Sequence, residues 1–302
     1  IVESNPQINK VYIYDRDESK KDLVGYWLKL FQDIRREKFD VVFDFSLNTS
    51  FGFLSMVCGI SKRIGYDFRG RGRFSTDKTV LKGFENKHVV EYFLDLLALV
   101  GVPVENRSLE ICVDKDSQQW AQNWVKSKNI DTSKPLFAII PGAGASWGKD
   151  GVRRRWPVEK YASLADKIIA KSKGAIILMG DQTEKNLAVD FVRHCSYPVY
   201  DALGETSLLQ MAALLQHCQL AIVNDGGPLH VAVAVGTKTV SIFGPQNPDI
   251  YGPYLPLGHI VIQKQLACQP CYRRFRVAQC DHLSCLQNLS VEEVYSKIEA
   301  II

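Results

Sequence analysis

The residues with the clearest potential for chemistry lie in the second half of the chain, each group directly after a short apolar run. Residues 136–140 are followed by Pro141-Gly142-Ala143-Gly144 and then by the basic run Arg153-Arg154-Arg155. Glycines let backbone N–H groups approach an anion, and arginines neutralise it. The spacing is neither that of a Walker A loop nor that of a GxGxxG dinucleotide fingerprint. The segment indicates a diphosphate site, and the alternative is a loop with a solvated basic run.

A carboxylate follows the next apolar run. Residues 175–179 lead into Gly180-Asp-Gln-Thr-Glu184. A carboxylate at the carboxyl end of a strand can bind ribose hydroxyls, as it does in dinucleotide-binding folds. Glu184 could equally favour the first turn of the helix that follows it. The residues alone leave these two interpretations open.

The third group has the pattern of a strand, a glycine turn and a helix that begins with proline. Residues 220–223 precede Asn224-Asp225-Gly226-Gly227-Pro228-Leu229-His230. The free N–H groups and the dipole of such a helix bind anions, and His230 would lie within reach of that anion unless its role is structural. A fourth turn, at residues 244–248, follows another apolar run. Four such loops in one domain predict a site for a nucleotide that carries a sugar.

Four of the eight cysteines form a separate cluster. Their spacing is Cys268-x2-Cys271-x8-Cys280-x4-Cys285. In a reducing compartment, a Cys-x2-Cys pair followed by two more thiols predicts a structural zinc site. A loop of free thiols and an iron–sulfur site are the alternatives.

The order of apolar and amphipathic segments predicts the elements that position these residues. Apolar runs alternate with helical patterns, which indicates α/β domains with parallel sheets covered on both faces. In such sheets ligands bind at the carboxyl ends of the strands. A polar segment at residues 130–135 predicts a boundary between a domain of residues 1–130 and a domain of residues 131–302, the second holding the cysteine cluster and a C-terminal helix. Residues 11–14 and 109–113 are predicted strands of the first domain.

Composition and charge limit the class of protein. Apolar residues make up 46% of the 302 positions and the net charge is +4, which is typical of a globular protein and implies no nucleic-acid partner. We find neither a membrane-spanning run nor a signal peptide, so a cytoplasmic protein is expected. Residues 62–82 hold seven Lys or Arg against two Asp. This segment is either a solvated loop or a patch for a phosphorylated partner.

Residues 224–248 resemble the signature of glycosyltransferase family 9, the ADP-heptose:lipopolysaccharide heptosyltransferases. The common form of that signature is D-S/T-G-x-x-H, then an apolar helix, then F-G-P-T. The segment from Pro141 to Pro157 is similar to the family's PGA…K-R-W-P. The resemblance implies two Rossmann-like domains of GT-B type with the site in the cleft between them. It also implies inverting transfer of heptose from an ADP-sugar to a lipid-linked lipopolysaccharide core, without a catalytic metal.

The resemblance also implies roles for residues. Asp225 and His230 would contact the diphosphate and the heptose, and Glu184 would hold the nucleoside. Arg154, where the family usually has lysine, would steady the departing diphosphate. The backbone around this site would complete it, and the full donor-binding set is Gly142, Ala143, Gly144, Arg154, Glu184, Asp225, Gly226, Gly227, Leu229 and His230. Gly226 replaces the usual Ser or Thr. Catalysis would rest on His230, Arg154 and a general base.

The start of the chain departs from the family. The family's first strand and loop, which carry the aspartate base, have no counterpart before Val11, so we expect that Ile1 is not the natural start. Asp44, which follows an apolar run, is then the candidate base, or else a structural carboxylate. The basic segment at residues 62–82 would face the acceptor at the cytoplasmic side of the inner membrane. A nucleotide-sugar epimerase and a non-catalytic nucleotide-sugar-binding protein of the same architecture are the alternative functions.

Overall fold

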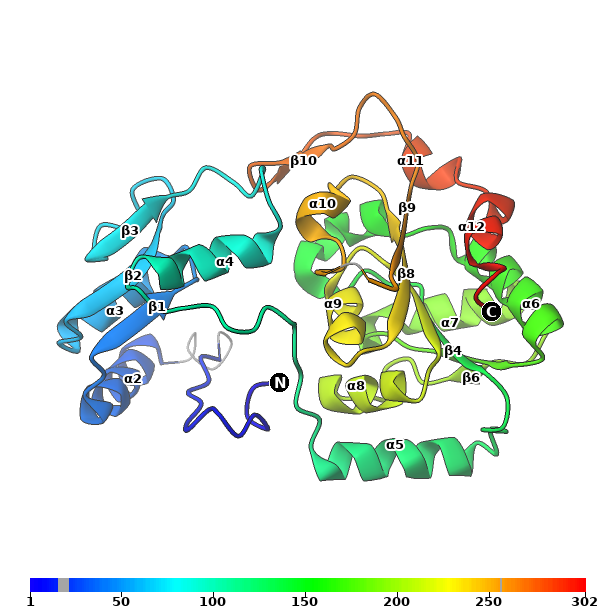
Figure 1. Ribbon diagram of the computed structural model, residues 1–302, viewed down its shortest axis with the longest axis horizontal. Helices are drawn as coiled ribbons and strands as arrows, with labels where there is room; N and C mark the ends of the chain where they lie inside the picture. The colour runs from blue at the N-terminus through cyan, green and yellow to red at the C-terminus, as the bar shows by residue number, and fades with distance from the viewer. Residues whose placement is uncertain (16–21, 256) are drawn as a thin grey trace. The chain divides into compact units, whose positions relative to one another are not determined.

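The chain folds into two compact α/β units, each built on a parallel sheet (Figure 1). The computed structural model describes residues 1–15, 22–255 and 257–302. The smaller unit comprises residues 8–107, and the larger unit comprises residues 1–7 and 108–302.

The smaller unit has a three-stranded parallel sheet in the order β1-β2-β3. Residues 11–14, predicted as a strand, form none. The carbonyl of Ile13 instead accepts a hydrogen bond of 2.7 Å from Tyr26 Oη, so this segment is bonded to a helix rather than to the sheet. The elements are α2 (Leu23–Glu37), β1 (Val41–Asp44), α3 (Thr49–Val57), β2 (Lys62–Asp67), β3 (Asp77–Val80) and α4 (Val89–Ala98).

The larger unit has a six-stranded parallel sheet in the order β6-β5-β4-β7-β8-β9. Every residue of the two central strands β4 and β7 is buried, because continuous apolar strands are covered by helices on both faces. The predicted doubly wound sheet is therefore confirmed. The strands are β4 (Leu136–Ile140), β5 (Ala175–Leu178), β6 (Tyr200–Asp201), β7 (Leu220–Asn224), β8 (Lys238–Phe243) and β9 (Ile260–Gln263).

Two apolar cores lie on the two faces of this sheet. One is formed with α6 (Val158–Ser172), α7 (Lys185–His194) and α12 (Val291–Ile298), the other with α5 (Lys115–Ser127), α8 (Leu208–Gln216) and α9 (Gly227–Ala234). Capping boxes begin α8 at Ser207 and α12 at Ser290. The short elements are η1 (Ala145–Arg154), η2 (Gln182–Glu184), α10 (Pro248–Tyr251), β10 (Tyr272–Arg273), β11 (Arg276–Val277) and α11 (Ser284–Gln287).

The boundary between the units differs from the predicted boundary at residue 130. Helix α5 belongs to the larger unit, which begins at residue 108 in this part of the chain. The reason is that Ala121, Trp124 and Val125 of α5 pack into the core that α8 forms beneath the sheet. Residues 109–113, predicted as a strand of the first domain, form no strand and lead into α5.

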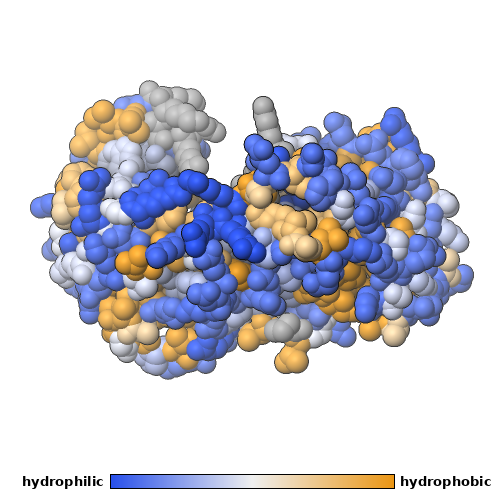
Figure 2. Space-filling model, turned by 90° about the horizontal axis from the view of Figure 1, so that it is seen from above, coloured by the Kyte–Doolittle hydropathy of each residue, from blue (hydrophilic) through white to orange (hydrophobic). Residues whose placement is uncertain are grey.

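Hydrophilic residues cover much of the face seen in Figure 2, and hydrophobic residues form separate patches among them. The described helices include none that is long and apolar enough to cross a membrane. The exposed apolar side chains thus belong to a surface of mixed character, as is usual for folded proteins.

The packing of α5 predicts a stability difference between its two tryptophans. Trp124 is 7% exposed and its Nε1 donates to Glu205 Oε2 at 3.1 Å, whereas Trp120 is half-buried. Trp124→Ala should destabilise the larger unit by about 3–5 kcal/mol, because it leaves a cavity between α5 and α8. Trp120→Ala is the control and should cost clearly less. Urea unfolding followed by circular dichroism measures both, and an equal loss for the two variants would place α5 outside the core.

Candidate functional site

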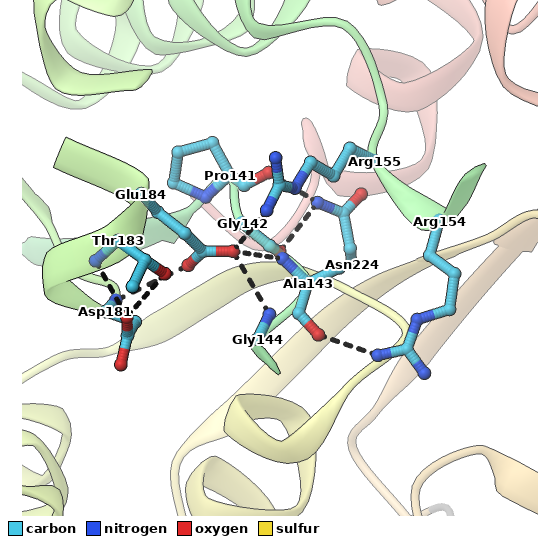
Figure 3. A network of polar contacts seen from close by, with 10 residues as sticks. All are labelled: Pro141, Gly142, Ala143, Gly144, Arg154, Arg155, Asp181, Thr183, Glu184 and Asn224. Atoms are coloured by element: carbon cyan, nitrogen blue, oxygen red, sulfur yellow. Dashed lines mark hydrogen bonds and ion pairs between the residues drawn. The ribbon is translucent and has the colours of Figure 1, made fainter. Parts of the chain in front are cut away.

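The carboxylate of Glu184 holds the glycine loop that follows β4. Its side chain is 4% exposed. Its Oε1 accepts hydrogen bonds from the backbone N–H groups of Ala143 at 3.0 Å and Gly144 at 3.2 Å, and from Arg155 Nη2 at 2.8 Å (Figure 3). A side chain at Gly142 would collide with this carboxylate. Glu184 therefore shapes the loop, and the predicted contact with a nucleoside stays a prediction.

Asn224 fastens the same loop from the end of β7. Its Nδ2 donates to the carbonyls of Pro141 at 2.7 Å and Gly142 at 3.0 Å. Its Oδ1 accepts from the backbone N–H of Trp156 at 2.9 Å and from Tyr161 Oη at 2.9 Å. Asn224 is 2% exposed, and all the hydrogen-bond donors and acceptors of its side chain have partners. The sequence pattern alone assigned Asn224 no role, although an amide at the end of an apolar run was the available signal.

Two buried residues of opposite charge, Arg154 and Asp225, lie beside this loop and influence each other electrostatically. Arg154 is 3% and Asp225 is 2% exposed, and Arg154 Nη2 donates to the carbonyl of Ala143 at 2.6 Å. Burial raises the pKa of Asp225 to about 7, and the Arg154 charge opposes that rise. Among the described residues, Asp225 Oδ2 is buried without a hydrogen-bond partner. A buried oxygen of this kind is costly unless a ligand satisfies it.

The first turn of α9 begins directly after Asp225. A Cβ at Gly226 would lie 2.9 Å from the carbonyl oxygen of Ala143 and 3.2 Å from Arg154 Nη2, whereas a Cβ at Gly227 would meet nothing within 4 Å. The structure therefore leaves open space at Gly227. Leu229, predicted to bind the donor, lies in the core, and its N–H donates to the carbonyl of Gly226. Its placement does not support a contact with a ligand.

These loops border a cavity of about 610 Å³ in the larger unit. Its walls include Gly144, Glu184, Gly227 and His230, so the structure brings together three of the four predicted strand-end loops. The cavity has the size of a small-molecule site. The lining also includes Gly180, Asp181 and Pro228 of the predicted loops. The lining residues that the sequence analysis did not assign to the donor site are Ile1, Leu109, Glu110, Ile111, Thr206, Ser207, Leu208, Met211, Val231 and Ala234.

Asp44 lies at the carboxyl end of β1 in the smaller unit. Its Oδ1 accepts hydrogen bonds from Ser46, 2.8 Å from the backbone N–H and 2.6 Å from Oγ. These local bonds fit a turn-forming carboxylate, and the predicted role as general base is not tested by them.

The four clustered cysteines lie in the segment between β9 and α12, which we call the cysteine-rich loop (residues 264–285). Burial, together with the neighbouring Cys268, Cys285 and Cys280, raises the pKa of the Cys271 thiol to about 11. The four thiols are thus within electrostatic reach of one another. No three Cys, His, Asp or Glu side chains of the described residues form a ready metal site.

A family model matches most of the chain. Residues 27–282 match the model of glycosyltransferase family 9 (heptosyltransferase). The chain belongs to glycosyltransferase family 9. This membership confirms the predicted family and enzyme class, and it favours glycosyl transfer over an epimerase or a non-catalytic binding protein.

Curated relatives of this family 9 chain are similar at low identity. Lipopolysaccharide core heptosyltransferase OpsX of Haemophilus influenzae is 23% identical over 252 residues, which span 82% of this chain and 68% of the relative. Lipopolysaccharide heptosyltransferase 2 of Escherichia coli is 24% identical over 243 residues, 76% of this chain and 67% of the relative.

Solved structures of the family share the fold. A family 9 glycosyl transferase from Veillonella parvula has a TM-score of 0.76 at 22% identity and covers 95% of this chain and 80% of its own. The ADP-heptose lps heptosyltransferase II of E. coli has a TM-score of 0.72 at 21% identity, and the match covers 92% of this chain and 81% of the E. coli chain. The predicted α/β fold of GT-B type with parallel sheets is confirmed.

The buried carboxyl of Asp225 predicts a pH-dependent stability of the ligand-free protein. Its pKa of about 7 lies above the ordinary 3.8, so its contribution to stability is complete below about pH 4 and is lost as the pH rises through 7. Asp225→Asn stays neutral. Thermal scans should therefore show that the unfolding temperature of Asp225→Asn minus that of the unmodified protein increases from pH 5 to pH 8.

Asp181 is the control for this experiment because its pKa is shifted in the opposite direction to that of Asp225. Hydrogen bonds from Thr183 lower the pKa of Asp181, so Asp181→Asn should lose stability at pH 8 relative to the unmodified protein. An Asp225→Asn protein with an unchanged pH profile would contradict the buried charge.

Proposed function

We propose that this enzyme transfers heptose, with inversion, from ADP-heptose to the inner core of a lipopolysaccharide acceptor. One observation carries the assignment of the donor site. The cavity of about 610 Å³ is bordered by the open first turn of α9 and by the glycine loop that Glu184 holds. The names of the relatives, and a solved E. coli heptosyltransferase WaaC with ADP at a TM-score of 0.68 and 17% identity, support this donor.

The departing diphosphate would meet positive charge from two sources. The N-terminus of α9 presents the positive end of the helix dipole. Arg154, already fixed to the carbonyl of Ala143, adds a guanidinium that matches phosphate geometry. His230 lines the same cavity from the first turn of α9. These groups supply the stabilisation that a metal provides in other transferases, so we propose that catalysis requires no metal.

The acceptor would be recognised by the smaller unit. Arg69, Arg71 and Arg73 are exposed, and their guanidinium groups lie over the rings of Phe68 and Phe74. Exposed arginines stacked on aromatic rings suit the phosphates of a lipid-linked saccharide. We therefore propose that this segment faces the acceptor at the cytoplasmic side of the inner membrane, with Asp44 as the candidate base.

Calorimetry with ADP and UDP tests the donor site. ADP should bind, with a preference over UDP. Arg154→Ala, Asp225→Ala and His230→Ala should each weaken binding of the sugar nucleotide or turnover at least about tenfold, because each removes a hydrogen bond to a charged group. Arg193→Ala and His194→Ala alter exposed residues of α7 and are the matched controls. A chain that binds no nucleoside diphosphate at millimolar concentration would refute the assignment.

We also propose that the cysteine-rich loop holds one structural zinc. The mutual electrostatic influence of Cys268, Cys271, Cys280 and Cys285 supports it, and binding would draw their sulfurs together. Elemental analysis after purification without chelator should find about one zinc per chain. The metal should be lost in Cys268→Ser and retained in Cys112→Ser. Its removal should lower stability more than turnover. Four freely titrating thiols without metal would refute this proposal, and iron would point to the alternative cluster.

A further inference from the structure

The two oxygens of the Glu184 carboxylate have different surroundings. Oε1 accepts three hydrogen bonds, two from backbone N–H groups of the glycine loop and the third from Arg155 Nη2 at 2.8 Å (Figure 3). Oε2 accepts only a long one, of 3.4 Å, from the backbone N–H of Asp181 within the described part of the chain. Because a carboxylate oxygen has two lone pairs, Oε2 can accept a further hydrogen bond.

The less occupied oxygen lies beside the cavity of the donor site. Glu184 and Gly180 both border that cavity. A Cβ at Gly180 would lie 3.3 Å from Oε2, so this oxygen is next to a part of the cavity wall that has no side chain to cover it. The carboxylate is also buried, and a hydrogen bond to a ligand is stronger where bulk water is excluded.

The backbone that carries Arg155 is fixed to the sheet by the next residue. Trp156 is 1% exposed, and its backbone N–H donates to Asn224 Oδ1 at 2.9 Å. Its indole Nε1 donates to the carbonyl of Leu289 at 3.0 Å. The backbone N–H of Arg155 itself donates to the carbonyl of Val152 at 3.2 Å. The guanidinium of Arg155 therefore extends from a fixed point of the chain.

The ion pair between Arg155 and Glu184 limits how the carboxylate can turn. The Glu184 side chain is 3% exposed and the Arg155 side chain is 29% exposed. A hydrogen bond of 2.8 Å between two charged groups is a strong one. The last torsion of a glutamate side chain is otherwise broad, so the guanidinium narrows the range of orientations that the loop N–H groups alone would allow.

We infer that Arg155 is a positioning residue for the donor. By holding Oε1 of Glu184, it keeps Oε2 turned to the cavity, where Oε2 accepts hydrogen bonds from the ribose hydroxyls of a nucleoside diphosphate. Arg155 is not one of the residues that border the cavity, so it acts through Glu184. This inference rests on the proposed function, since it assumes that a ribonucleotide occupies the cavity.

Arg155→Met tests the positioning, because it removes the guanidinium and keeps an unbranched apolar stem. Calorimetry compares ADP with 2′,3′-dideoxy-ADP, which lacks the ribose hydroxyls. The unmodified protein should prefer ADP by about tenfold or more, the usual effect of a hydrogen bond to a charged group. In Arg155→Met this preference should largely disappear, through weaker binding of ADP. Arg155→Lys replaces the fork by a point charge, and its preference should lie between the two.

Arg153→Met is the matched control from the same basic run. The Arg153 guanidinium contacts Asp150 at 3.4 Å and the carbonyl of Ala278 at 3.3 Å instead of Glu184, so this variant should keep the preference for ADP. In a Glu184→Ala background, Arg155→Met should cause no further change in the preference, because both residues act through one carboxylate.

The outcomes separate this inference from the proposed function. Equal losses of ADP and 2′,3′-dideoxy-ADP in Arg155→Met would mean that the ion pair only shapes the glycine loop, and the inference would be overturned. An unchanged preference in Arg155→Met, or in Arg155→Lys should the first variant not fold, would overturn it too. If the unmodified chain binds neither nucleotide, the proposed function fails. If it binds both equally well, only the present inference fails.

Discussion

The site depends on one buried carboxylate. Glu184 lies in η2, after β5, yet its Oε1 accepts hydrogen bonds from two backbone N–H groups of the loop after β4 and from Arg155. A buried charge is tolerated only when it is compensated in this way. Because the partners belong to a different strand end, the carboxylate joins the two loops, and the absence of a side chain at Gly142 leaves the room it needs. Asn224 completes the arrangement from β7.

The Arg154–Asp225 pair contrasts with this network. Glu184 and Asn224 are satisfied within the protein, whereas Asp225 keeps a buried oxygen without a partner in the described structure, and its pKa is raised to about 7. Glu184 and Asp225 are therefore similarly buried, but only Asp225 has an oxygen without a hydrogen-bond partner in the described structure. The satisfied network fixes the backbone, and the unsatisfied pair retains the capacity to bind a ligand. A cost in stability at such a position is common where a protein must recognise a charged substrate.

The sequence predicted what depends on local pattern. Continuous apolar runs identified β4, β7 and β8. It could not predict what depends on a distant partner. The amphipathic pattern of α5 shows that one face is buried but not that α8 covers it. Residues 11–14 have strand-like composition without a strand to pair with. The hydrogen bond from the backbone N–H of Tyr272 to the carbonyl of Pro245, in the turn after β8, has no signature in the sequence.

Two departures from the usual family pattern, at Arg154 and Gly226, lie next to each other in the structure. Arg154 stands where the resemblance implies a lysine, and Gly226 where it implies Ser or Thr. The guanidinium reaches the carbonyl of Ala143 with one nitrogen and still compensates Asp225, which requires the breadth of a fork rather than a point charge. A Cβ at position 226 would press on that nitrogen at 3.2 Å and on the carbonyl of Ala143 at 2.9 Å. Both contacts favour glycine at position 226, and the closer one is with the backbone of the glycine loop itself.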